Sequence, residues 1–429
     1  MLDIETLRQA TRRFAPLDLT PGWLKETRDQ ALQALETHGL PTTADEQWRY
    51  TDLAPLAARI TEISRLQGPP ERIELPDGDF VDDAAIVVID GIFRPDLVTQ
   101  PLPPGVTVRS MITAPALPSD LPPDGGYRAA AGGIESLKTT LLRDILLLEI
   151  APGIEVTRPI RTAFFTTGRS LCHDVLMVRI GPGSRATVIE HHGGTGAGVS
   201  STSMRIDCGP GSRLHYAKVE ELPDAACHLG SQQIQIGEDA SAALLHVDIG
   251  GHLVRNDLQV NLLGRAAEVT ANGLFFADDS RHIDIHTRID HLKPHTRSRE
   301  LYRGIADGKG RGVFNGKVIV HRNAYGSDAQ LRNQNLLLGS GSEIDTKPEL
   351  EIYTDDVKCA HGATTGQLDP NAVFYLRTRG IPAELARQLL VASFAREIVM
   401  ELPEGYLLDH VIKALAPRLP ALREAGECP

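Results

Sequence analysis

A short turn motif recurs along the middle of this 429-residue chain at a nearly constant interval. Ile180-Gly-Pro-Gly-Ser-Arg is followed by Cys208-Gly-Pro-Gly-Ser-Arg, and related turns return at Ile236-Gly-Glu-Asp and Leu263-Gly-Arg-Ala. The glycines of these four turns are separated by 28, 28 and 27 residues, namely Gly181, Gly209, Gly237 and Gly264. A weaker first copy begins at Ile150, and degenerate later copies are expected at Ile305 and Leu338. A period of 20–50 residues is typical of stacked repeats.

Each copy is a turn followed by an alternating run rich in β-branched residues, with no segment long enough for a helix. Helical solenoids and βαβ units therefore fit the repeat poorly. A coil made only of strands suits a parallel β-solenoid, in which each turn buries its inward residues against the next. The sequence thus predicts a mainly β protein with a parallel β-helix core, and an irregular β-sandwich is the alternative.

The two ends of the chain lack the repeated turn motif and have sequence patterns typical of helices. Thr20-Pro21 offers a helix start and Gly39 a helix stop, so the N-terminal region is expected to be helical. Near the other end, 383–400 and 406–415 have apolar residues at helical spacing. We therefore divide the chain into a helical region over 1–80, a β-helix core over 81–365 and a helical region over 366–429. The last helices would either cap the solenoid or bind a partner.

Three shorter segments read as a strand with its turn and as two connecting loops. Residues 84–93 read as a strand and turn, whereas 66–80 and 101–127, rich in proline, glycine and acid, read as connecting loops.

Charge and composition exclude several classes of protein. The net charge of −12 argues against a nucleic-acid surface, which normally carries a basic excess. No stretch approaches the roughly 20 apolar residues that a membrane span needs, and the acidic N-terminus lacks the order of a signal peptide. The five cysteines are scattered and odd in number, which does not indicate a disulfide framework. A cytoplasmic protein is the resulting prediction.

Cys359 and His361 are the residues with the clearest chemical meaning. They lie two residues apart in a run that reads as extended, so both side chains leave the same face of a strand. A thiol and an imidazole on one face form half of a metal site, since zinc ions and Fe–S clusters usually take about four ligands. The missing ligands would come from elsewhere, such as another chain. The alternative is a buried cysteine beside a hydrogen-bonded histidine.

Four further histidines fall within 14 residues, with two aspartates between them: His282, His286, His291 and His295, with Asp284 and Asp290. They could be metal ligands, but we favour a polar face of the solenoid whose histidines hydrogen-bond to neighbouring turns. The glycines at 181 and 183 resemble a dinucleotide fingerprint, yet no helix pattern follows them. The runs 304–309 and 312–317 fall short of a P-loop, so this chain is not expected to hydrolyse ATP by itself.

Several long motifs, in fixed order, resemble the SufB/SufD family of Fe–S cluster assembly proteins. The motifs are Gln47-Trp-Arg-Tyr-Thr-Asp-Leu, His286-Thr-x-x-x-His291, Arg311-Gly-Val-Phe-Asn-Gly-Lys-Val-Ile-Val-His, Gln330-Leu-Arg-Asn-Gln-Asn-Leu-Leu-Leu, Glu351-Ile-Tyr-Thr-Asp-Asp-Val-Lys-Cys-Ala-His-Gly-Ala-Thr-Thr-Gly and Asp369-Pro-Asn-Ala-Val-Phe-Tyr-Leu-Arg-Thr-Arg-Gly-Ile. The resemblance covers most of the chain and is densest over 280–400. The chain length and the Lys-Cys-x-His-Gly-Ala motif resemble those of the SufD branch.

The resemblance implies a right-handed parallel β-helix between helical ends. It also implies a SufBCD complex in which this chain, a non-catalytic scaffold subunit, pairs with SufB. A nascent Fe–S cluster would form at that interface, with Cys359 and His361 as ligands shared with SufB. Two copies of the SufC ATPase would supply all ATP chemistry, and SufC would bind the C-terminal helices. Some family complexes hold a reduced flavin, which no residue here places.

Two other functions are weighed against this one. In the first, the chain is a purely structural scaffold whose Cys359 and His361 bind nothing, and all cluster chemistry lies on SufB. In the second, it is a polysaccharide-processing β-helix enzyme, which the aromatic content of 5% disfavours because sugars need aromatic platforms. The isolated chain could also form a homodimer.

Overall fold

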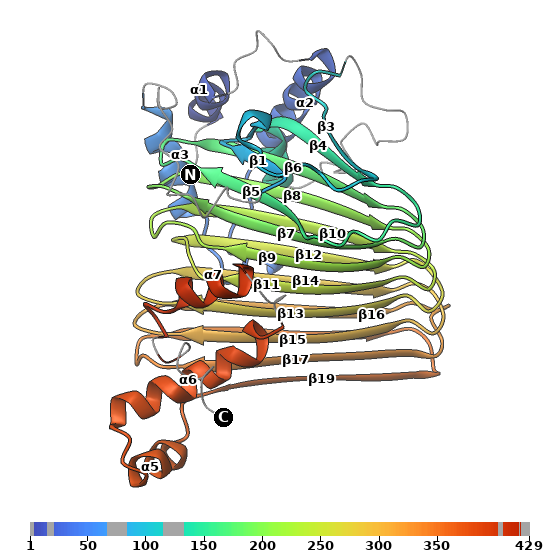
Figure 1. Cartoon of the computed structure of the whole chain (residues 1–429). Coiled ribbons are helices and arrows are strands. Elements are labelled where there is room, and N and C mark those ends of the chain that lie inside the picture. Colours follow the sequence, from blue (N-terminus) through green and yellow to red (C-terminus); the bar gives the residue numbers. More distant parts are fainter. Residues whose placement is uncertain are drawn as a thin grey trace.

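The computed structural model describes residues 4–14, 21–66, 84–114, 133–401, 406–419 and 421. Its centre is a solenoid of about eight turns built from two facing sheets (Figure 1). The chain alternates between the sheets, so that odd-numbered strands form one and even-numbered strands the other. This arrangement confirms the mainly β parallel solenoid that the repeat predicts.

The odd-strand sheet has the spatial order β19-β17-β15-β13-β11-β9-β7-β5-β1-β2. Its strands are β1 (Ile86–Ile89), β2 (Ile92–Phe93), β5 (Ile160–Thr166), β7 (Arg185–Gly194), β9 (Arg213–Glu220), β11 (Ser241–Asp248), β13 (Glu268–Ala277), β15 (Arg297–Ala306), β17 (Ser327–Leu337) and β19 (Val357–Gly366). The even-strand sheet has the order β18-β16-β14-β12-β10-β8-β6-β4-β3. Its strands are β3 (Val106–Ser110), β4 (Leu142–Ile150), β6 (Leu171–Ile180), β8 (Val199–Cys208), β10 (Cys227–Ile236), β12 (Leu253–Leu262), β14 (His282–His291), β16 (Arg311–Val320) and β18 (Glu343–Ile352).

The strands of each sheet pair in parallel, except at the N-terminal end, where β1–β2 and β3–β4 are antiparallel. Equivalent residues of successive turns lie side by side, as in the row Leu214, Ala242 and Val269. These side chains are buried between the sheets. The expected strand and turn at 84–93 is confirmed as β1 and β2. The expected loop at 101–127 is wrong in part because it contains β3, and much of it lies outside the described residues.

The repeated glycines stack at one corner of the solenoid, as predicted. The Gly181 amide donates to the carbonyl of Ile150 at 2.9 Å, and the Gly209 amide donates to that of Ile180 at 2.9 Å. A Cβ atom at Gly209 would lie 2.8 Å from the Ile180 oxygen, so the close approach of successive turns requires glycine. The later copies expected at Ile305 and Leu338 are wrong in position. They form turns at the opposite corner, after odd-numbered strands.

A residue with a left-handed backbone conformation recurs in the turns at this corner. Gly183 and Gly211 have φ of 68° and 66°, while Asp239, Ala266 and His295 hold φ of 53°, 55° and 60° without being glycine. Alanine carries a steric penalty there because its Cβ atom approaches the following carbonyl oxygen.

Ala266→Gly is therefore expected to stabilise the protein, by about 1 kcal/mol. The free energy of unfolding from urea denaturation measures the change. Gly183→Ala is the reciprocal variant and should destabilise by a similar amount. A lower urea midpoint for Ala266→Gly would contradict the strain argument.

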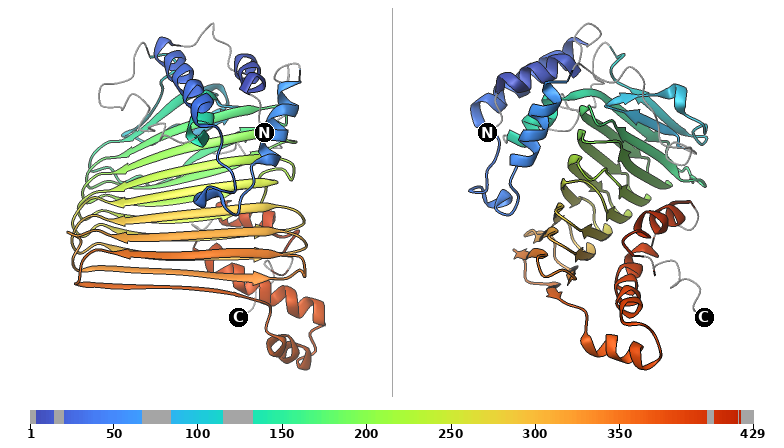
Figure 2. Two further views of the ribbon diagram at one scale, coloured as in Figure 1. Left: turned by 180° about the vertical axis from the view of Figure 1, so that it is seen from behind. Right: turned by 90° about the vertical axis from the view of Figure 1, so that its left-hand side faces the viewer.

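Helices cover both flanks of the solenoid (Figure 2). The N-terminal group lies over the even-strand sheet and comprises α1 (Ile4–Phe14), α2 (Gly22–His38), α3 (Ala54–Ser64) and α4 (Gly133–Thr140), with the 3-10 helix η2 (Glu46–Trp48). A second 3-10 helix, η4 (Pro95–Leu97), follows β2 and packs on β1 and β5 of the odd-strand sheet. Gly39 ends α2 at φ 69°, as predicted. The start differs slightly, since Pro21 is the cap residue and Thr20 lies outside the described residues.

The C-terminal helices are α5 (Pro370–Thr378), α6 (Ala383–Val399) and α7 (Tyr406–Leu415). Helices α6 and α7 pack on the outer face of the odd-strand sheet, where Ile398 and Val411 join a buried cluster with Val219 and Phe276. They therefore lie on a flank of the solenoid and not across its last turn, so the capping interpretation is wrong for these helices. None of the described helices is long and apolar enough to cross a membrane.

The interior is apolar near the glycine corner and polar near the other. Six inward side chains form one chain of hydrogen bonds across the turns, in the order Tyr302, His246, Gln232, Tyr216, Glu190 and His192. The Tyr302 hydroxyl lies 3.0 Å from His246 Nδ1, and His246 Nε2 lies 2.7 Å from Gln232 Oε1. Tyr302 reaches His246 because Gly273, on the strand between them, leaves room for its ring.

Two buried side chains, Asp174 and His246, are expected to make the free energy of unfolding depend on pH. Burial raises the pKa of Asp174 to about 8 and lowers the pKa of His246 to about 3. The aspartate holds a proton in the folded chain that it loses when unfolded, so its contribution falls as pH rises toward 8. The histidine contribution changes only below pH about 6.5, its unfolded pKa.

The free energy of unfolding is therefore expected to decrease between pH 6.5 and 8, and Asp174→Asn should flatten this decrease. Urea denaturation at several pH values measures both slopes. An unchanged slope in the variant would show that Asp174 is ionised in the folded chain.

Candidate functional site

Cys359 and His361 both lie on β19, the last strand of the odd-strand sheet. Cys359 is in register with Ala329 and His361 with Leu331, and both of these neighbours point into the buried interior. The pair therefore continues the inward rows of the solenoid, on one strand face, about 7 Å apart along the strand. The shared face predicted from the sequence is thus present.

The strand that carries the pair is an edge strand. In the described part of the chain, β19 pairs only with β17, and β18 pairs only with β16. Both sheets therefore end at the same end of the solenoid (Figure 1). Such edges present unpaired N–H and C=O groups that can receive a strand of another chain.

The two side chains differ in their surroundings. Cys359 is half-buried and packs against the main core cluster, whereas His361 is exposed because no further turn covers it in the described chain. Burial raises the pKa of the Cys359 thiol, so the free thiol is protonated at neutral pH. Binding of iron would have to displace that proton, since the thiolate is the ligand.

Beneath Ala363 and Thr365, further along β19 from His361, lies a polar layer that we did not predict from the sequence. Thr346 of β18 donates to Asn333 Oδ1 at 2.8 Å, and Asn335 Nδ2 donates to Thr365 of β19 at 3.3 Å. Asn333 also donates to the carbonyl of Tyr302 at 3.2 Å. The signal was present, since asparagines at 333 and 335 stand at inward positions of a strand, in register with Tyr302 and Gly304 of the preceding turn.

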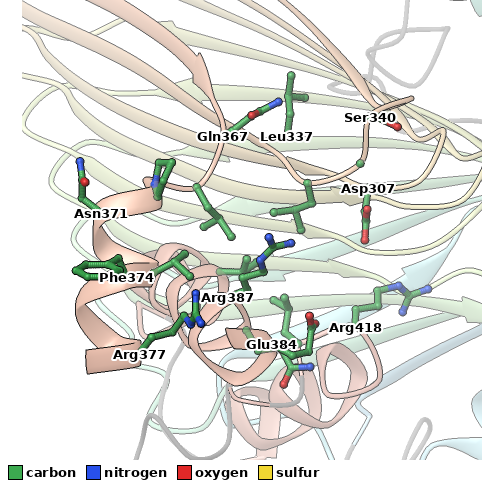
Figure 3. A pocket seen from close by; sticks show the side chains of 18 residues that line it. Asp307, Leu337, Ser340, Gln367, Asn371, Phe374, Arg377, Glu384, Arg387 and Arg418 are labelled. Atoms are coloured by element: carbon green, nitrogen blue, oxygen red, sulfur yellow. The ribbon is translucent and has the colours of Figure 1, made fainter. Parts of the chain in front are cut away.

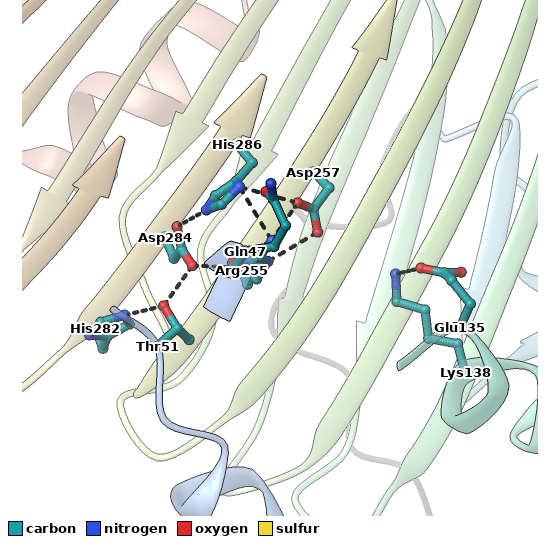
Figure 4. A network of polar contacts seen from close by, with 9 residues as sticks. All are labelled: Gln47, Thr51, Glu135, Lys138, Arg255, Asp257, His282, Asp284 and His286. Carbon is teal, nitrogen blue, oxygen red and sulfur yellow. Dashed lines mark hydrogen bonds and ion pairs between the residues drawn. The ribbon is translucent and has the colours of Figure 1, made fainter. Parts of the chain in front are cut away.

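The histidine-rich run forms hydrogen bonds, as favoured over a metal site, but mostly within its own turn or to the N-terminal segment and not to neighbouring turns. His286 Nε2 lies 3.0 Å from Asp284 Oδ1, and His282 Nε2 lies 2.8 Å from the Thr51 hydroxyl (Figure 4). Arg255 bridges this cluster to the N-terminal segment, where it donates to the Gln47 carbonyl at 2.6 Å. The Gln47–Leu53 motif therefore fastens the N-terminal region to β12 and β14.

The other two histidines of the run are also engaged. Buried His291 lies 2.8 Å from Thr296 Oγ1 and 2.9 Å from Ser298 Oγ, and His295 packs edge-on against Tyr325. Among the described residues, no group of three or more His, Cys, Asp and Glu side chains is arranged to hold a metal ion. Cys359 and His361 are thus two donors at an open end, without a third beside them in the described chain.

Comparisons with known proteins show the family of the chain. The model of the SUF system FeS cluster assembly SufBD core domain matches residues 164–394, and that of the SufBD protein N-terminal region matches 18–162. The iron-sulfur cluster assembly protein SufD of Escherichia coli is 31% identical over 91% of this chain and 92% of its own length. A SufBD family protein of Synechocystis is 29% identical (92% and 91%), and the chloroplastic protein ABCI7 of Arabidopsis thaliana is 26% identical (90% and 84%). The chain therefore belongs to the SufB/SufD family of Fe–S cluster assembly proteins.

Proposed function

We propose that this chain is a SufD-type scaffold subunit in the cytoplasm, which pairs with a SufB-like subunit through the open end of its solenoid. The observation that carries the proposal is the position of Cys359 and His361 on the inward face of an edge strand. A partner that continues the two sheets would enclose both side chains. Its own ligands would then complete the set of about four that a cluster needs.

In this proposal the nascent cluster is the cargo of the complex and forms at the junction. A soft thiolate and an imidazole suit iron and sulfide. The remaining ligands come from the SufB-like subunit, so the isolated chain should hold iron weakly. A flavin takes part in no step proposed for this chain.

We further propose that a SufC-like ATPase binds the C-terminal region over 366–429. Helices α6 and α7 bury one face on the odd-strand sheet, and α5 extends from them beyond the last turn (Figures 1 and 2). The ATPase would supply the ATP chemistry of the complex.

Anaerobic co-expression with SufB-like and SufC-like subunits tests the proposal. We expect a stable complex that contains this chain and accumulates iron and sulfide, whereas the chain alone accumulates little. Failure to bind the SufB-like subunit would overturn it.

The same open end could also join two copies of this chain when no partner is present. We expect a homodimer of the isolated chain to dissociate as the SufB-like subunit is added, because both would use β18 and β19. Light scattering coupled to size-exclusion chromatography distinguishes the two species. A homodimer that binds the SufB-like subunit without dissociating would show that its interface lies elsewhere.

A further inference from the structure

A pocket of about 990 Å³ opens between α5, α6 and the turn that joins β17 to β18 (Figure 3). Its apolar wall includes Leu338, Leu368 and Val391. Arg377, from the last turn of α5, and Arg387, from the second turn of α6, line it as well. The pocket lies on the hairpin of α5 and α6, outside the cluster of Cys359 and His361.

Arg377 and Arg387 have no side-chain partner in the part of the chain that the structure describes. Neither side chain forms a hydrogen bond or ion pair with another residue of the described chain, although Arg418, a third arginine of the pocket, donates to Asp278 at 3.0 Å. Glu384 and Asp307 also line the pocket, but Arg377 and Arg387 form no ion pair with either of them. In a chain of net charge −12, this is a place where an incoming carboxylate is favoured.

The hairpin has the features of a preformed interface. Asp369 caps α5 by accepting the Asn371 amide at 2.9 Å, which fixes the helix before any partner arrives. None of the residues of α5 is buried, and Phe374, on the rim of the pocket, is 64% exposed. Exposed aromatic and arginine side chains beside a partly apolar pocket are typical of the centre of a protein–protein interface.

We propose that this pocket receives a segment of the SufC-type ATPase that carries an acidic residue next to an apolar one. The carboxylate would bind Arg377 and Arg387, and the apolar side chain would contact Phe374 and the wall around Val391. The inference rests on the proposed binding of that ATPase and adds the place and the chemistry of the contact.

The test is the affinity of the full chain for the ATPase, measured by calorimetry with wild type and with Arg377→Glu/Arg387→Glu. We expect the double variant to bind roughly tenfold to hundredfold more weakly. Raising the salt from about 50 mM to about 500 mM should weaken wild-type binding more than that of the variant. Phe374→Ala should also weaken binding, without any change of charge.

Arg185→Glu/Arg213→Glu is the matched control, because it makes the same change of charge at exposed positions on the odd-strand sheet. This control should bind the ATPase with wild-type affinity. The melting temperature of every variant should lie within about 2 °C of that of wild type. Lost binding in the control as well would show that net charge, and not this pocket, controls the affinity.

Three results would overturn the inference. Unchanged affinity in the arginine double variant and in Phe374→Ala, with wild type binding normally, would reject the pocket and leave the proposed function intact. Wild type that does not bind the ATPase would reject the proposed function itself. A rise in the melting temperature of the isolated chain with inorganic phosphate, lost in the double variant, would assign the pocket to a free anion.

Discussion

A complex assembled with His361→Ala is expected to yield about tenfold less Fe–S cluster than the wild-type complex. Cys359→Ser should have a similar effect, because a hard, poorly ionised hydroxyl replaces a soft thiolate. Both residues lie at the open end, where His361 is exposed and contributes little packing. Iron and acid-labile sulfide after anaerobic reconstitution, together with the visible absorption spectrum, measure the yield.

Thr364→Ala is the matched control, since this exposed residue lies on the same strand but on its opposite face. It should form clusters normally. The free energy of unfolding of His361→Ala and Thr364→Ala should stay within about 0.5 kcal/mol of wild type, as for other exposed positions. Normal cluster yield in a Cys359/His361 double variant would show that the chain is a purely structural scaffold.

The second large effect concerns a charge buried inside the solenoid. Lys218 is 2% exposed, and its ammonium lies 2.8 Å from Glu220 Oε2 and 2.7 Å from Asn256 Oδ1. Burial alone would lower the pKa of Lys218, but the carboxylates of Glu220 and Asp248 raise it. Lys218→Met would leave Glu220 buried without its cation, and we expect a loss of about 3–5 kcal/mol in the free energy of unfolding.

Lys347→Met is the control for this prediction, because Lys347 pairs with Glu46 at the surface at 2.9 Å. Its loss should cost at most about 1 kcal/mol. Lys218→Met/Glu220→Leu should recover part of the stability by removing the unpaired carboxylate as well. Equal urea midpoints for Lys218→Met and Lys347→Met would show that water reaches the buried pair.

Much of the fold follows from the sequence because its turns repeat. The glycines at 181 and 209 predict the corner correctly, since only glycine allows successive turns to approach so closely. The copies expected at Ile305 and Leu338 were misplaced because a glycine turn has a similar sequence at both corners. Only the register of the strands between the turns distinguishes one corner from the other.

Contacts between distant segments could not be predicted in this way. Trp48 stacks under the Arg255 guanidinium at 3.9 Å, across more than 200 positions of sequence, and neither residue belongs to a periodic pattern that indicates the other. The common face of Cys359 and His361 was predictable from their spacing alone. Their position at an open end was not, because it depends on where α6 and α7 pack.

The hydrogen-bonded chain inside the solenoid has a consequence for how the turns find one another during folding. Sliding a strand by two residues keeps its apolar face inward, so hydrophobic patterning alone does not prevent such an error. In the native pairing Tyr216 lies beside Val188, and its hydroxyl reaches Glu190. A slip of two residues would separate these groups and leave a carboxylate buried without its donor. The polar residues thus distinguish each turn from the next, which the nearly identical glycine turns cannot do.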